Sequence, residues 1–256
     1  RRAQSTVVSY FKALYPVWAR LSPDMVSASS ELAMAELLLS GCTTTTDHHY
    51  VFPAGHEDAI DRQVAAAQAL GIRVVLTRGS MSLSVEDGGL PPKSVVQDED
   101  SILADSARLI DRFHDRDALA MTQIALAPCS PFSVSRELMR DAAILARDKG
   151  VMMHTHLAEN AEDIAYSHAH FGCRPGQYAE DLGWTGADVW HAHCVKLDSS
   201  EIAMFAGSAT GVAHCPCSNC RLGSGIAPVR AMRDAGVRVG LGVDGSASND
   251  VGNLMA

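Results

Sequence analysis

The sequence has no basic run, no long apolar run and no signal-peptide pattern, and each absence excludes a class of protein. Its 256 residues carry a net charge of −9. Without clustered lysine and arginine to neutralise phosphates, neither a nucleic acid nor an anionic membrane surface is expected as a partner. No apolar stretch approaches the roughly 20 residues that cross a bilayer. The odd count of seven cysteines argues against a disulfide framework and for reduced thiols in the cytoplasm. Whether the chain forms a homo-oligomer is left open.

A dinucleotide-binding Gly-x-Gly-x-x-Gly turn is also missing, and the chain instead repeats one strand–helix unit. Short β-branched runs predict seven strands, at Gly41–Asp47, Ile72–Thr77, Thr122–Ala127, Val151–His156, Val189–His193, Gly211–His214 and Val237–Val243. Amphipathic stretches predict helices at Tyr10–Leu21, Asp24–Leu39, Glu57–Leu70, Asp98–Asp115, Ser135–Lys149, Ala161–Phe171, Ser199–Ala206 and Ala227–Ala235. We expect helix-ending glycines at Gly71, Gly150, Gly211 and Gly236. This alternation, at about 250 residues, predicts the α/β class and a parallel (β/α)₈ barrel of the TIM type.

Seven strands are one fewer than a closed barrel needs. Residues Arg1–Leu39 read as helical and suit the helices that lead into the second strand, so the first strand is expected upstream. The chain begins without methionine and stops directly after a strong motif, which favours a fragment. We therefore predict one partial barrel domain over residues 1–256, covering strands two to eight. The aperiodic stretch Ser80–Gln97 is expected to be an unstructured lid or binding loop on the catalytic face.

Histidines and acids gather where the predicted strands end. They are Asp47, His48, His49, His154, His156, His191, His193, His214 and Asp244. The carboxyl ends of barrel strands converge on one patch, where the active site lies. Imidazoles with a carboxylate suit Zn²⁺ or Fe²⁺ more than Mg²⁺, and such a metal lowers the pKa of bound water from 15.7 to about 7. Glu159 follows closely enough to move a proton between that water and a leaving group.

Simpler interpretations compete with a metal site. A single histidine at a strand end is usually a hydrogen-bonded core residue, and His168 and His170 fall within a predicted helix as surface or packing residues. The run Cys215–Cys220 contains Pro-Cys-x-x-Cys, which is similar to the zinc site of cytidine-type deaminases. Those enzymes need His-x-Glu, however, whereas this chain has His-x-x-Glu at His156–Glu159. A structural zinc on the cysteines lacks a closely spaced fourth ligand, and the alternative is that they pack within a βα loop.

Taken in order, the motifs at the strand ends resemble those of the aminohydrolase branch of the amidohydrolase superfamily. They are His154–Glu159, Ala192–Cys194, His214–Asn219 with Leu222–Pro228, and Gly242–Asn249. The resemblance implies one divalent metal, Zn²⁺ with Fe²⁺ as the alternative, bound by His156 and Asp244. Glu159 would be the general acid and base, with Asp244 as a second proton acceptor, and His193 would orient or polarise the substrate. His214 and Asn219 would support substrate binding, and Arg78 would contact the purine.

Further stretches are most similar to members of this branch that deaminate 8-oxoguanine. They are Gly41–Tyr50, Arg78–Ser82 with Asp87–Pro92, and Ala13–Trp18. The resemblance implies hydrolysis of this small heterocycle at C2, giving urate and ammonia. The alternatives are a hydroxyatrazine-type triazine, another purine or pterin, and a catalytically silent barrel with a binding role.

The sequence departs from the family pattern in one respect. In the family, a first-strand His-x-His supplies two of the four metal ligands, and nothing in Arg1–Leu39 matches it. We therefore expect the isolated chain to hold half a metal site and to show little or no activity.

Overall fold

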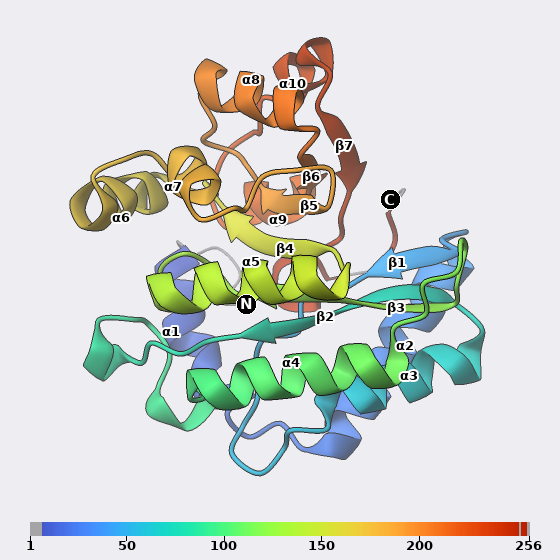
Figure 1. Ribbon diagram of the computed structural model, residues 1–256. Coiled ribbons are helices and arrows are strands. Elements are labelled where there is room, and N and C mark those ends of the chain that lie inside the picture. Colours follow the sequence, from blue (N-terminus) through green and yellow to red (C-terminus); the bar gives the residue numbers. More distant parts are fainter. Residues whose placement is uncertain (1–6, 251, 255–256) are drawn as a thin grey trace.

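Seven parallel strands form one curled sheet in the computed structural model, which describes residues 7–250 and 252–254 (Figure 1). The strands are β1 (Thr44–Thr46), β2 (Arg73–Ser80), β3 (Thr122–Pro128), β4 (Met153–Leu157), β5 (Val189–His193), β6 (Gly211–His214) and β7 (Arg238–Leu241). Each strand pairs with its neighbours in the sequence, in the order β1 to β7. The prediction of a barrel covering strands two to eight is confirmed.

Helices precede β1 and fill every connection between strands. They are α1 (Val7–Trp18), α2 (Pro23–Leu39), α3 (Ala59–Leu70), α4 (Glu99–Phe113), α5 (Arg136–Lys149), α6 (Ala161–Phe171), α7 (Pro175–Asp181), α8 (Ser199–Ser208), α9 (Pro216–Arg221), α10 (Val229–Ala235) and α11 (Ser246–Asn249). The sequence analysis missed α7, α9 and α11, which are too short to show a helical period. Within the described residues, no helix is long and apolar enough to cross a membrane.

The main core lies between the sheet and the helices on its outer side. Side chains alternate along a strand, so Val74 and Leu76 of β2 both face this layer and are fully buried. Leu109 of α4 and Met139 of α5 pack into the same core. Each such side chain stabilises the fold by about 1.5–3 kcal/mol. One continuous cluster connects residues of α2 with residues near β7, so the sheet and its helices form a single packed unit.

Glycine ends helices at three of the four expected positions. Gly71, Gly150 and Gly236 have positive φ angles at the ends of α3, α5 and α10. The expectation for Gly211 is wrong, because Ala209 ends α8 with a φ of 59° and Gly211 opens β6. A Cβ atom at Gly211 would lie 3.2 Å from the Cβ of Trp190. This glycine therefore allows β6 to approach β5 closely.

The stretch between β2 and α4 is ordered rather than unstructured, which corrects the prediction. It contains two 3₁₀ turns, η1 (Val85–Asp87) and η2 (Lys93–Val95). Met81 and Val95 bury their side chains in a cluster with Tyr15 of α1, whose hydroxyl donates to the Met81 sulfur at 3.6 Å. Figure 1 shows α1 at the end of the sheet toward which β2 points. The loop and α1 thus cover part of the end of the sheet at which β2 ends.

Candidate active site

Three imidazoles meet inside the curled sheet. His154 and His156 share the inward face of β4, and the ring of His48, just after β1, lies 4.6 Å and 4.3 Å from theirs. His154 stacks on Trp190 and donates Nδ1–H to its carbonyl oxygen at 3.0 Å. His156 donates Nδ1–H to the Cys129 carbonyl at 2.7 Å. This bond leaves the Nε2 lone pair of His156 available to a ligand.

Left-handed backbone at the strand ends brings further functional groups to this side of the sheet. His191 faces the helices, where its Nε2 donates to the Trp184 carbonyl at 2.9 Å. Simple alternation would send His193 the same way. Instead, His193 has a φ of 68° and stacks on His156 with ring centroids 5.3 Å apart. Ala158, before Glu159, and Asp244 are also left-handed, with φ angles of 49° and 61°. Such residues are rare away from glycine and often occur at functional sites.

Glu159 and His193 form a buried acid–imidazole pair. Glu159 Oε2 lies 3.9 Å from His193 Nε2, and the two residues are 7% and 2% exposed. Ser224 donates its hydroxyl to Glu159 Oε1 at 2.9 Å. On the other side, His193 donates Nδ1–H to Asn219 Oδ1 at 2.8 Å. Both members of the pair are therefore held by hydrogen bonds at the atoms that face away from each other.

Asp244 supplies a second carboxylate at the end of β7. Its oxygens accept hydrogen bonds from the Ser218 hydroxyl and the Gly245 amide. Burial acts to raise the pKa of Asp244, but His193 and the Ser218 hydrogen bond outweigh it and hold this pKa below its usual value. Burial acts to lower the pKa of His193, but the carboxylates of Glu159 and Asp244 outweigh it and raise this pKa. Positive charge on His193 and negative charge on Asp244 thus support each other.

The donors present are of the kind that zinc binds. Burial, followed by repulsion from His193, lowers the pKa of His156, so its imidazole is neutral and can ligate. His156 Nε2 and the Asp244 carboxylate match two of the ligand types of catalytic zinc sites. No group of three or more His, Cys, Asp or Glu suited to a metal ion occurs among the described residues. The alternative of a zinc site on the cysteines finds no support, since Cys217 and Cys220 are exposed free thiols on α9.

Two predicted substrate-binding residues have polar atoms without a partner. The Nδ1 atom of His214 and the Nδ2 atom of Asn219 are buried and unpaired within the part of the chain that the structure describes. Buried polar groups normally find a hydrogen-bond partner. Burial, then the charge of His193, lowers the pKa of His214. Both residues therefore suit the binding of a polar, uncharged ligand.

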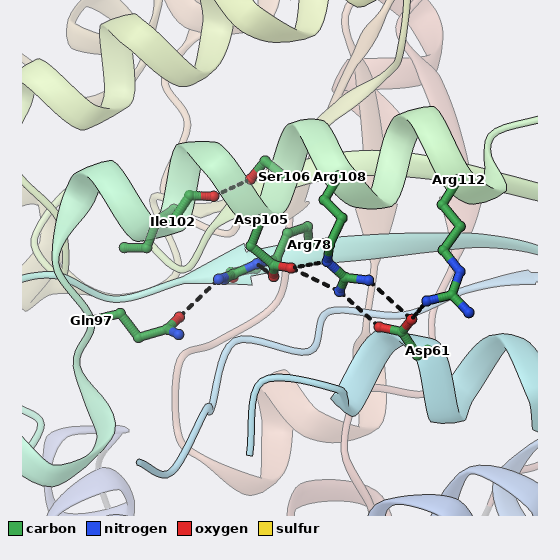
Figure 2. A network of polar contacts seen from close by, with 9 residues as sticks. Asp61, Arg78, Gln97, Ile102, Asp105, Ser106, Arg108 and Arg112 are labelled. Carbon is green, nitrogen blue, oxygen red and sulfur yellow. Dashed lines mark hydrogen bonds and ion pairs between the residues drawn. The ribbon is translucent and has the colours of Figure 1, made fainter. Parts of the chain in front are cut away.

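Arg78, expected to contact the purine, lies elsewhere (Figure 2). Its position on β2 directs the side chain toward the helices, where it is 1% exposed. The guanidinium donates to Asp105 of α4 at 2.7 Å, to Gln97 at 2.9 Å and to the Gly79 carbonyl, and it lies 4.0 Å above the Phe52 ring. Alternation along β2 could have predicted this orientation, and the structure gives Arg78 a role in packing β2 against α4.

Several site residues escaped the sequence analysis. Ser224 and Ser218 hold the two carboxylates, but their segments were considered only as parts of motifs. Helix α1 adds Tyr10, whose pKa is raised to about 12 by burial and then by the charge of Asp244. Tyr50 has its ring centroid 5.8 Å from that of His156. These contacts join chain segments that are far apart in the sequence, so no local sequence pattern predicts them.

Comparison with known proteins places the same motifs in a family. Residues 3–256 match the amidohydrolase family. An 8-oxoguanine deaminase from Pseudomonas aeruginosa is 52% identical over 246 residues, or 96% of this chain and 55% of that protein. A hydroxydechloroatrazine ethylaminohydrolase from Pseudomonas sp. is 40% identical over 252 residues, covering 98% of this chain and 52% of that protein.

Comparison of the fold with solved structures supports the same family. An atrazine chlorohydrolase from Arthrobacter aurescens TC1, solved in complex with zinc, superposes with a TM-score of 0.95 at 34% identity. The alignment covers 100% of this chain and 58% of that one, and the chain spans about half the length of the curated relatives that it matches. The family match, the similar relatives and the shared fold together show that the chain belongs to the amidohydrolase family.

Proposed function

We propose that the protein containing this chain is a metal-dependent aminohydrolase that converts 8-oxoguanine and water into urate and ammonia. The observation that carries the proposal is the buried Glu159–His193 pair, 3.9 Å apart, next to His156 and Asp244. Hydrolytic deamination requires a carboxylate that transfers protons, an imidazole that orients the reactants and donor groups that bind a metal, and all of these lie here on one side of the sheet. The substrate is taken from the 52% identical 8-oxoguanine deaminase.

Each residue of the pair has a defined task. Glu159 accepts a proton from the attacking water and delivers it to a ring nitrogen as oxygen bonds to C2. His193 orients the water and polarises the substrate. Asp244 then takes the remaining proton of the new C2 hydroxyl group and passes it to the exocyclic nitrogen, so that the C2–N bond breaks as the C2=O bond forms and ammonia leaves. Asp244 must be ionised to accept this proton, and the lowered pKa of its carboxyl group favours the ionised form.

A divalent metal is part of the proposal, with Zn²⁺ first and Fe²⁺ second. His156 through Nε2 and Asp244 through its carboxylate would hold it, and a relative was solved with zinc. When bound, such an ion lowers the pKa of a coordinated water to about 7. The acidic chain has no feature that opposes an uncharged heterocycle, and His214 and Asn219 offer unpaired polar atoms to it.

A triazine is the second candidate substrate. It is favoured by the hydroxydechloroatrazine relative and by the fold shared with an atrazine chlorohydrolase. Another purine or a pterin would use the same residues. The candidate of another class is a barrel without activity that is retained for binding.

A substrate panel separates these candidates. The complete protein, loaded with zinc, would be assayed for ammonia release from 8-oxoguanine, guanine, isocytosine and hydroxyatrazine. We expect the highest kcat/KM with 8-oxoguanine. If hydroxyatrazine alone were turned over, a triazine would replace 8-oxoguanine as the proposed substrate. If none of the four compounds were turned over, the catalytically silent barrel would be supported.

Glu159→Gln tests the proposed proton transfer. We expect kcat to fall by about 10²–10⁴-fold, the usual contribution of a positioned acid or base, while metal content by elemental analysis stays unchanged. Glu162→Gln, a change at an exposed residue of α6, is the matched control and should retain activity. Equal rates for the Glu159 variant and the wild type would remove Glu159 from the mechanism.

We also infer the setting of the protein. All seven cysteines are free, which fits the reducing cytoplasm. We treat residues 1–256 as one partial barrel domain, because one core cluster runs through its helices and strands. The substrate is the partner that we propose, and association of identical subunits is left to measurement.

A further inference from the structure

We propose that Ser224 is a positioning residue that holds the Glu159 carboxylate in its reactive orientation, so that α9 and the turn after it together hold both members of the proton-transfer pair. The proposal rests on the function proposed above for Glu159 and His193. Ser224 follows α9, and its hydroxyl donates to Glu159 Oε1 at 2.9 Å. Asn219, within α9, accepts from His193 at 2.8 Å. One segment of the chain therefore contacts both partners.

The turn that carries Ser224 is rigidly tied to α9. The Ser224 amide donates to the Asn219 carbonyl at 2.9 Å, and the Asn219 amide donates to the Cys215 carbonyl at 2.9 Å. Gly223 and Gly225 flank the serine with φ angles of 73° and 116°, which a residue with a side chain rarely adopts. The Ser224 amide is thus bonded within the turn, while its hydroxyl donates to Glu159.

Orientation matters because Glu159 has two carboxylate oxygens and a long side chain. Its segment is held from the backbone side, where the Glu159 amide donates to Asp163 at 2.8 Å. Only the Ser224 bond fixes the carboxylate oxygens themselves among the hydrogen bonds found in the described chain. With Oε1 engaged, Oε2 faces His193 Nε2 at 3.9 Å. Small displacements of reacting groups strongly reduce rates, so losing this bond should slow the proton transfer.

The test uses the complete protein with Ser224→Ala and Ser224→Thr. We expect Ser224→Ala to lower kcat by about 10–100-fold, because a misplaced reacting group loses up to about 10²-fold. KM should change less than threefold, and the threonine hydroxyl should restore part of the lost rate. Ser106→Ala is the matched control, since Ser106 is also buried and donates to a carbonyl, that of Ile102, at 2.7 Å (Figure 2). It should keep the wild-type kcat.

A second measurement does not depend on activity. Crystal structures of the wild type and of Ser224→Ala should show the Glu159 carboxylate rotated away from His193 in the variant, with equal metal content. An unmoved carboxylate, or a kcat within twofold of the wild type, would overturn the proposal. If the wild type turned over no heterocycle of the panel, the proposed function would fail, and the crystal comparison would still decide the role of Ser224.

Discussion

At the scale of single residues, Asp47 shows how a buried carboxylate ties β1 to its surroundings. One of its oxygens accepts from the amide of Thr77 at 2.8 Å, and the other accepts from the side chain of Gln63 at 2.8 Å. Burial raises the pKa of Asp47 to about 6, although these hydrogen bonds oppose the change. The desolvation of the charged form outweighs the bonds that it accepts.

This pKa predicts how stability depends on pH. The folded carboxyl binds its proton more tightly than the unfolded one, whose pKa is near 3.8. The stability that this group contributes is therefore complete below about pH 4 and is lost as the pH rises through about 6. Between pH 4 and 7, urea unfolding should show a loss in the free energy of unfolding that is about 2–3 kcal/mol larger for the wild type than for Asp47→Asn. Exposed Asp100 provides the control, Asp100→Asn, and parallel curves for the wild type and Asp47→Asn would contradict the expectation.

The sequence predicted which residues gather at the candidate site, but not the groups that hold them in place. His156, Glu159, His193 and Asp244 lie together as predicted, because each lies at or just after the carboxyl end of a strand of one parallel sheet. Ser224 could not be predicted, because its partner is 65 residues away and its position depends on a turn. The inward orientation of the His193 side chain could not be predicted either, because a left-handed backbone conformation at a residue other than glycine leaves no pattern in the sequence.

At the scale of elements, an ion-pair network joins β2 and α3 to α4 (Figure 2). Asp105 accepts from buried Arg78 and, through its other oxygen, from Arg108 at 2.8 Å. Arg108 and Arg112 also reach Asp61 of α3. The buried guanidinium depends on Asp105 for its counter-charge, whereas Asp105 has a second arginine and is partly exposed.

This asymmetry predicts unequal effects on stability. Asp105→Ala should reduce the free energy of unfolding by about 3–5 kcal/mol, because it leaves a buried charge uncompensated. Arg78→Met removes that charge, so its effect should be smaller by at least about 1 kcal/mol. Arg112→Ala removes an exposed side chain from Asp61, which keeps Arg108 as a partner, so stability should change by less than about 1 kcal/mol. Chemical denaturation measures all three, and equal losses for Asp105→Ala and Arg78→Met would refute the argument.

The predicted elements differ in how closely they match the structure. The bounds of β5, β6 and α6 are as predicted, and α6 has clear local signals at both ends, the N-cap Asn160 and the left-handed Gly172. The strand predicted at Gly41–Asp47 shortens to Thr44–Thr46, because few of its residues find partners on β2. The loop after β2 is ordered by contacts with α1, which lies far away in the sequence. Local periodicity carries no information about such contacts.

At the scale of the whole molecule, the seven-stranded order could be predicted because strand and helix alternate so regularly. The order also determines which strands have one neighbour. Among the described strands, β1 pairs with β2 alone and β7 with β6 alone. Leu241, on β7, is 57% exposed.

We expect the two outer strands to favour self-association of the 256-residue chain. Backbone groups along an edge can pair with a strand of another molecule, and exposed apolar side chains favour this. Sedimentation velocity should detect species larger than the monomer, in a fraction that grows with protein concentration. Leu241→Lys should decrease that fraction, because charge at an edge repels an approaching copy. A purely monomeric chain at all concentrations would show that both edges are protected, and the outer strands would then have no bearing on how the chain behaves in solution.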